Sequence, residues 1–217
     1  ARAFRFPRLR AARQHPPVHA VRVAVDALDG PAHDELVDGA AAQAHTDPAA
    51  ALDAYEKTIL AAPQQRLHTD PVVHAYAITA RRCGFHREHL VAFFSSMRAD
   101  LTQREYSPSE LQDYIYGSAE AIGLLCLQIF LAEEDVSPAD RAAMERGARA
   151  LGSAFQKINF LRDLGEDSST LGRTYFQQAP SGRIDEATKS ALIAEIRQEL
   201  ATAALTIDVL PASARVG

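Results

Sequence analysis

The chain has little of what several classes of protein require. It contains only two cysteines, Cys83 and Cys126, far apart in the sequence, so neither a disulfide framework nor a cysteine-based zinc site is expected. It carries no GxGxxG fingerprint, which excludes a dedicated Rossmann nicotinamide domain. The longest apolar run, residues 121–132, is interrupted by Gln128 and is too short to span a bilayer. These absences favour a cytoplasmic protein with reduced thiols.

The chain also lacks a large excess of charge of either sign. The 217 residues carry a formal net charge of −5, which argues against nucleic acid as a partner because phosphate backbones require a basic surface. Mild acidity is compatible with a phosphorylated small molecule when metal ions supply the positive charge. The basic start, residues 1–14, lacks the apolar core of a secretory signal. Peripheral contact with an anionic membrane surface and a frayed terminus are two open interpretations of it.

The alternation of polar and apolar residues that is typical of β-strands is missing as well. Asp47-Pro48, Ser107-Pro108 and Ser137-Pro138 each place a capping side chain before a proline at the first helical position. No repeat or linker divides the chain, so we expect one all-α domain, residues 1–217, with a central cavity. The predicted helices cover residues 17–28, 32–42, 48–62, 71–83, 87–103, 108–133, 138–165 and 185–206.

A stripe of amides and carboxylates is the most informative feature that is present. In a helix, Gln156, Asn159, Asp163 and Asp167 fall within an arc of about 80° and form one polar face about three turns long. Such a ladder can hold divalent cations and, through them, a polyphosphate. The opposite face is predicted to enter the core and carries Leu151, Ala154, Ile158, Leu161 and Leu164.

A second acidic motif, HDELVDG, lies at residues 33–39. Asp34 and Asp38 are four residues apart, so both project from one helix face, where like charges repel unless they share a cation such as Mg²⁺. A solvated acidic face is the alternative interpretation. Asp26 and Asp29, three residues apart, compete for the same role. Two aspartate motifs that face each other across an apolar cavity predict metal-assisted ionisation of a hydrophobic diphosphate.

The segment YIYGSAEAIG, residues 114–123, combines Tyr114 with Gly117 and Gly123. Glycine within a helix is unfavourable by about 0.5–1 kcal/mol relative to alanine. Two glycines therefore indicate a close helix crossing, a kink or a wall thinned to admit a ligand chain. Tyr114 alone is equally consistent with a packed aromatic whose hydroxyl reaches the surface.

Together these segments resemble the squalene/phytoene synthase family, whose members join two prenyl diphosphates head to head. The most specific part is FQKINFLRDLGED (155–167) followed by GRTYF (172–176). HDELVDG resembles the first aspartate-rich motif of the family, and SSMRADL (95–101) and YIYGSAEAIG match two intermediate segments. The resemblance implies an isoprenoid-synthase-type helical bundle. It also implies that the chain lacks the C-terminal helices of the family.

The resemblance assigns roles to individual residues. Mg²⁺, or Mn²⁺ in its place, would be bound by Asp34, Asp38, Asp163 and Asp167, while Gln156 and Asn159 would complete the stripe that holds the diphosphates. Tyr114 would lie near the developing carbocation. Arg22 would pair with diphosphate, although residues 25–33 stand as an insertion between it and the first motif.

The implied reaction gives a cyclopropyl diphosphate intermediate and then a C30 or C40 hydrocarbon such as squalene, dehydrosqualene or phytoene. The use of NADPH is left open, as are the oligomeric state and the choice between C15 and C20 substrates. Two other functions stay under consideration: a terpene cyclase or head-to-tail prenyltransferase, and a non-catalytic helper or assembly protein with the same fold.

Overall fold

The computed structural model describes residues 20–21, 24, 47–166, 184–212 and 214–215. Within these ranges the regular structure is helical, apart from one isolated β-bridge residue, Glu105, so the all-α prediction is confirmed. A central cavity stays a prediction, because residues 25–46 and 167–183, which carry acidic motifs, lie outside the described ranges. None of the helices in these ranges combines the length and the apolar character that crossing a bilayer demands.

From residue 47 on, the described helices match the predicted ranges closely at most positions, whereas the predicted helices 17–28 and 32–42 lie almost wholly outside the described residues. The elements in chain order are α4 (Pro48–Ala61), the 3₁₀ helix η1 (Ala62–Gln64), α5 (Pro71–Cys83), α6 (Arg87–Thr102), α7 (Pro108–Ile115), the π-helical segment η2 (Tyr116–Glu120), α8 (Ala121–Phe130), α9 (Pro138–Glu166) and α10 (Glu186–Ile207).

The helix starts are set by short polar side chains, as the sequence predicts. Asp47 accepts a hydrogen bond from the backbone N–H of Ala49, and Ser137 accepts one from Asp140. Ser107 and Glu110 form a reciprocal capping box at the start of α7. Each cap satisfies N–H groups that the helix itself leaves without a partner. The predicted boundaries are accurate here because a local side chain fixes them.

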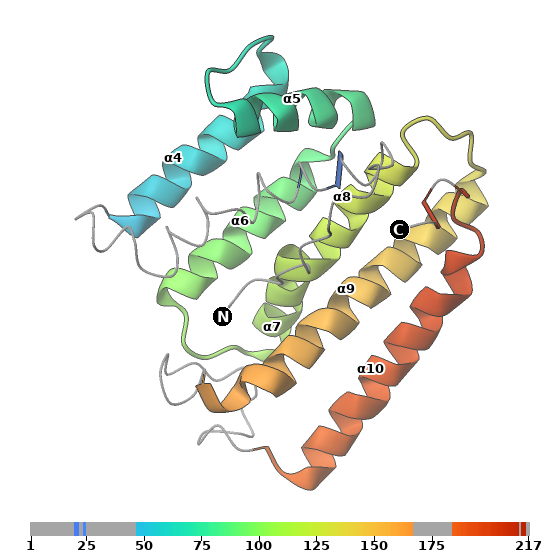
Figure 1. The fold of residues 1–217 in the computed structure, drawn as a ribbon. Coiled ribbons are helices and arrows are strands. Elements are labelled where there is room, and N and C mark those ends of the chain that lie inside the picture. Colours follow the sequence, from blue (N-terminus) through green and yellow to red (C-terminus); the bar gives the residue numbers. More distant parts are fainter. Residues whose placement is uncertain (1–19, 22–23, 25–46, 167–183, 213, 216–217) are drawn as a thin grey trace.

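Four of the described helices form one layer. α6, α8, α9 and α10 lie side by side, with α9 and α10 packed as a long antiparallel pair (Figure 1). α4 packs against α6, and α5 contacts α8 (Figure 1). α7 and η2 continue into α8 and sit between α6 and α9.

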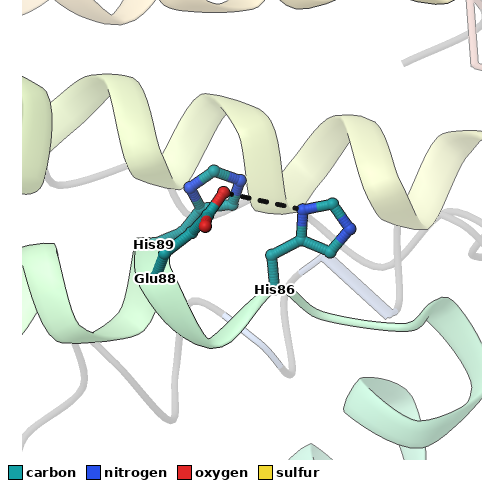
Figure 2. Close-up of side chains that lie close together, drawn as sticks. All are labelled: His86, Glu88 and His89. Carbon is teal, nitrogen blue, oxygen red and sulfur yellow. Dashed lines mark ion pairs between the residues drawn. The ribbon is translucent and has the colours of Figure 1, made fainter.

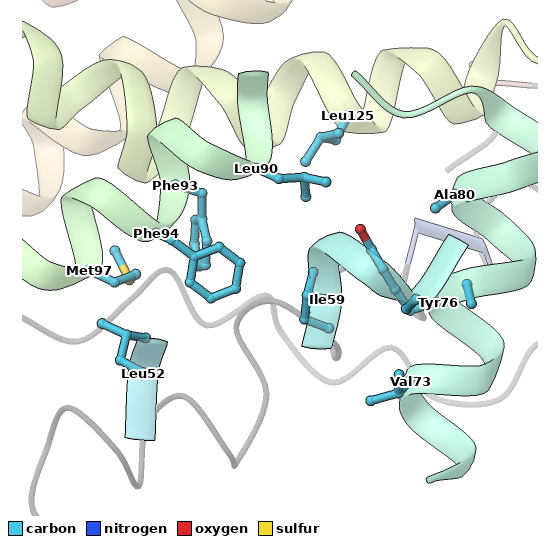
Figure 3. Packing of buried hydrophobic residues seen from close by; sticks show 12 residues of the cluster. Leu52, Ile59, Val73, Tyr76, Ala80, Leu90, Phe93, Phe94, Met97 and Leu125 are labelled. Carbon is cyan, nitrogen blue, oxygen red and sulfur yellow. The ribbon is translucent and has the colours of Figure 1, made fainter. Parts of the chain in front are cut away.

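The largest apolar cluster lies where α4, α5, α6 and α8 meet. Ile59 of α4, Tyr76 of α5 and Phe94 of α6 are fully buried there, and Leu125 of α8 closes the cluster (Figure 3). Burying an aromatic or branched aliphatic side chain of this size contributes about 1.5–3 kcal/mol. This cluster therefore holds α6, which also carries residues of the candidate site, in a fixed position.

The predicted core face of α9 is wrong in part. Ala154 is fully buried and Leu161 packs with it against α10, but Leu151 and Ile158 are 38% and 40% exposed. The physical reason is that α9 has neighbours on two sides, α10 on one and α8 with η2 on the other. Its buried residues therefore do not form one stripe. The side chain of Leu164 lies outside the described set.

A polar bridge joins α9 to α10. The buried ammonium group of Lys157 donates hydrogen bonds to Glu195 at 2.6 Å and Glu199 at 2.7 Å, and the Ser153 hydroxyl also donates to Glu199 at 2.8 Å. Burial disfavours the charged form of Lys157, but the hydrogen bonds and charges of the two glutamates outweigh it and raise its pKa. The bridge fixes the register of the two longest helices.

The range 108–133, predicted as one helix, is divided. Its middle widens into the π-helical η2, and the helix ends at Phe130, earlier than predicted. The two glycines mark close crossings: a Cβ on Gly117 would collide with Ala92 of α6, and one on Gly123 would lie 2.7 Å from the carbonyl oxygen of Ala148 on α9. Periodicity does not predict a π segment, because one added residue shifts the pattern only locally.

Candidate functional site

Three members of the predicted polar stripe lie on α9. Asn159 is buried, with 7% exposure, while Gln156 and Asp163 are half-buried. Their spacing of three and four residues puts the side chains on one face of the helix. The fourth member, Asp167, lies outside the described residues. The described part of the stripe therefore supplies amide and carboxylate oxygens from a rigid helix rather than from a loop.

Asp163 has a local cationic partner. The Nε and an Nη group of Arg162 donate to its two carboxylate oxygens at 2.7 and 2.6 Å. Because the two residues are neighbours in the sequence, this pair ties no separate elements together. Each carboxylate oxygen retains further acceptor capacity, so a bound cation would share Asp163 with Arg162.

Tyr114 is buried, and its hydroxyl does not reach the surface. The hydroxyl donates a 2.9 Å hydrogen bond to the Oδ1 atom of Asp100, a buried carboxylate on α6. The interpretation of Tyr114 as a tyrosine with a surface-reaching hydroxyl is therefore wrong. Its ring makes an edge contact with Tyr106, with centroids 5.2 Å apart. A phenol held between an aromatic wall and a carboxylate has a fixed orientation and an electron-rich oxygen.

The ring of Tyr114 also approaches α9. Its centroid lies 6.1 Å from that of Phe160, which directly follows Asn159 in the sequence. The structure thus brings the tyrosine near the segment of α9 that carries Asn159 and Asp163. Residues that are far apart in the sequence meet in one region, where α6, α7 and α9 come together.

The π-helical segment helps to set the position of Tyr114. The carbonyl oxygen of Tyr114 accepts hydrogen bonds from the hydroxyl groups of Ser96, at 3.1 Å, and Ser118, at 2.7 Å. These hydroxyls satisfy a carbonyl at the point where the regular helical pattern changes. Gly117 allows this turn to lie directly against the backbone of α6 at Ala92.

Asp100 is the residue that the sequence reasoning missed. It lies in the SSMRADL segment, which resembles the family but carries no predicted site residue. A usable signal was nevertheless present: Phe93, Met97 and Asp100 are spaced as one helical face, so the carboxylate falls on an otherwise buried stripe. A buried carboxylate needs a partner, and such a position is a natural candidate for function.

Comparison with known proteins decides the family. The model of the squalene/phytoene synthase family matches residues 10–180, well over half of the chain. The chain belongs to this family. Phytoene synthase 3 of Zea mays is 38% identical over 149 residues, covering 67% of this chain and 33% of the relative. The 4,4'-diapophytoene synthase of Staphylococcus haemolyticus is 32% identical over 111 residues, covering 51% and 36%. The chain spans about a third of the length of these curated relatives.

Two solved structures share the fold of this family member. Squalene synthase HpnC from Alicyclobacillus acidocaldarius superimposes with a TM-score of 0.65 at 22% identity, covering 91% of this chain and 73% of that one. A dehydrosqualene synthase gives a TM-score of 0.67 at 19% identity, covering 92% and 71%. The predicted isoprenoid-synthase-type bundle is therefore confirmed as a fold.

Several residues that the resemblance singles out in this squalene/phytoene synthase family member lie outside the described residues. They are Arg22, Asp34, Asp38, Asp167 and the competing pair Asp26 and Asp29. Whether they face Asp163 stays a prediction. The described half of the arrangement fits the donor chemistry of Mg²⁺, because a hard cation prefers the carboxylate and amide oxygens that Asp163, Asn159 and Gln156 offer. Mn²⁺ accepts the same oxygen donors.

Proposed function

We propose that the protein catalyses the Mg²⁺-dependent head-to-head condensation of two prenyl diphosphates. Farnesyl or geranylgeranyl diphosphate would pass through a cyclopropyl diphosphate to a C30 or C40 hydrocarbon such as squalene, dehydrosqualene or phytoene. The observation that carries this proposal is the packing of the buried Tyr114, hydrogen-bonded to Asp100, against Phe160 in the segment of α9 that also carries Asn159 and Asp163. Family membership supports it, since relatives include phytoene and diapophytoene synthases.

Each part of the described site has a role in this reaction. Asp163, with Asn159 and Gln156, would hold the diphosphate end together with Asp34, Asp38 and Asp167. Bound Mg²⁺ would supply positive charge that stabilises the leaving diphosphate. Because the α9 oxygens belong to a packed helix, they need little reorganisation as charge develops.

Tyr114 would act on the hydrocarbon end of the substrate. Its hydroxyl donates to Asp100, which holds the phenol in one orientation, and the phenol would stabilise a carbocation electrostatically. The carboxylate polarises the phenol and increases the electron density on its oxygen. Asp100 is thus a positioning residue in this proposal, and Phe160 and Tyr106 would keep water from the cation.

The test is incubation of the full chain with farnesyl or geranylgeranyl diphosphate and Mg²⁺. Pyrophosphate release and a C30 or C40 product by mass spectrometry are expected, and a chelator such as EDTA should abolish both. A C15 or C20 hydrocarbon would instead indicate a terpene cyclase. Binding of the prenyl diphosphate without turnover would indicate a helper protein, and the absence of both binding and turnover would refute the proposal.

Replacing Tyr114 with phenylalanine is expected to lower turnover by about 10- to 100-fold. Removing one preorganised electrostatic group from an active site lowers the rate by about 100- to 1,000-fold, and the smaller loss is expected here because phenylalanine keeps the aromatic ring. Tyr76→Phe is the matched control, since it also removes a buried hydroxyl, one without a hydrogen-bond partner in the described structure. Single-turnover rates of the two variants should differ; equal rates would contradict the role of Tyr114.

A further inference from the structure

Two histidines and a glutamate gather at the start of α6, away from Asp100 on the same helix. One ligand atom each from His86, Glu88 and His89 lies within 4.8 Å of the others. Figure 2 shows the three side chains turned toward one another, with His86 Nδ1 and the Glu88 carboxylate 4.0 Å apart. Asp100 lies eleven residues after His89 on the same helix, which corresponds to about 16 Å along the helix axis. The cluster is therefore separate from the Tyr114 region.

The fold does not need these side chains to begin the helix. α4, α5, α7 and α10 each start with an aspartate or serine that accepts backbone hydrogen bonds. At the start of α6 the N-cap residue is His86, and its side chain makes no such bond. Instead, the His86 backbone N–H is held by Gln128 of α8 at 3.3 Å. The His86 imidazole is thus placed by its backbone and is not used for capping.

His89 is oriented by a partner on another element. Its ring is buried, and Nδ1 lies 2.9 Å from the hydroxyl of Tyr116 in η2. With Nδ1 engaged, Nε2 would be the ligand atom. Histidines that bind metals nearly always have the second ring nitrogen held by a hydrogen bond, which orients the ring. In the tautomer suited to a metal, Nδ1 would donate to the Tyr116 oxygen and Nε2 would carry the lone pair.

Burial is the largest influence on the pKa of the His89 imidazole. Burial lowers the pKa of His89, and the positive charges of His86 and Arg149 act in the same direction. The carboxylates of Glu88 and Glu145 oppose them but do not reverse the shift.

We propose that His86, Glu88 and His89 form a binding site for a divalent transition metal ion such as Zn²⁺. Two imidazoles and one carboxylate are a three-ligand set that suits Zn²⁺, with water completing the coordination. Nitrogen donors discriminate against Mg²⁺, which prefers oxygen ligands. The site would thus remain selective for transition metals in the presence of the Mg²⁺ that the proposed reaction uses.

The test is calorimetric titration of the full chain with ZnCl₂ in excess Mg²⁺, which occupies oxygen-donor sites. Wild-type protein should bind Zn²⁺, and His86→Ala and Glu88→Gln should each weaken binding by at least about tenfold. Loss of a residue that only supports a metal ligand already weakens affinity by about 10- to 100-fold, so loss of a ligand itself should weaken it at least as much. Both residues are exposed, so these variants should fold, as circular dichroism would verify.

His74→Ala is the matched control, because it removes a half-buried imidazole from α5 that lies near another histidine, His68. Its Zn²⁺ affinity should equal that of the wild type. The proposal is overturned if wild-type protein takes up no Zn²⁺ in excess Mg²⁺. It is also overturned if His86→Ala and Glu88→Gln bind like the wild type, or if the loss is found in His74→Ala instead.

Discussion

Asp163→Asn is expected to lower the rate of pyrophosphate release from a prenyl diphosphate by about 100- to 1,000-fold. Removing one preorganised group that stabilises charge in a transition state has effects of this size. The substitution keeps the shape of the side chain but removes the negative charge that would bind Mg²⁺. The rate would be measured at saturating substrate by stopping the reaction at fixed times and assaying the released pyrophosphate.

The structure makes this a clean test of chemistry rather than of folding. The partner of Asp163 is the adjacent Arg162, so the substitution breaks no bridge between helices. Asp113→Asn is a matched control, because Asp113 is an exposed aspartate that directly precedes Tyr114. Normal activity in Asp113→Asn with near-complete loss in Asp163→Asn would support the proposed function. Equal activities in the two variants would remove Asp163 from the site.

The helices and their starts could be predicted because their determinants are local. Asp47, Ser107 and Ser137 satisfy backbone groups within their own segments, so no tertiary information was needed. The polar stripe was predictable for the same reason, since the spacing of Gln156, Asn159 and Asp163 follows from helical geometry alone.

The remaining features depend on contacts between segments that the sequence does not place. Leu151 and Ile158 were assigned to the core because one apolar stripe was assumed, whereas α9 packs on two sides. Asp100 could not be predicted as a site residue, because its role depends on a hydrogen bond from Tyr114 on another helix. The His86 cluster likewise depends on Tyr116, which only the packing of η2 brings to His89.

The π-helical segment η2 depends most clearly on a contact with another segment, and Gly117→Ala tests that contact with α6. We expect this substitution to reduce the free energy of unfolding by about 3 kcal/mol, the upper part of the usual range for overpacking. The added Cβ would collide with the Ala92 carbonyl oxygen and the Ser96 hydroxyl, and would lie 2.7 Å from the Ala92 carbonyl carbon. Backbone atoms of a packed helix cannot move aside as a flexible side chain can. Urea unfolding would measure the loss as a shift in midpoint.

Gly84→Asn provides the control for this prediction. Gly84 ends α5 with a positive φ of 65°, and a Cβ there would meet no atom within 4 Å. Asparagine tolerates this conformation, so the change should reduce stability by about 1 kcal/mol or less. If the urea midpoint of Gly117→Ala is no lower than that of Gly84→Asn, then η2 does not pack against α6 as closely as described.

The same substitution connects stability to the site. Ser96 both borders Gly117 and donates to the Tyr114 carbonyl, so a displaced η2 would move Tyr114 relative to Asp100. We therefore expect Gly117→Ala to lose turnover even at temperatures where it remains folded. Gly84→Asn should lose none, because Gly84 ends α5 and a Cβ there would meet no atom within 4 Å. The lack of a side chain at Gly117 is thus what allows α6 and η2 to hold a buried phenol and carboxylate together.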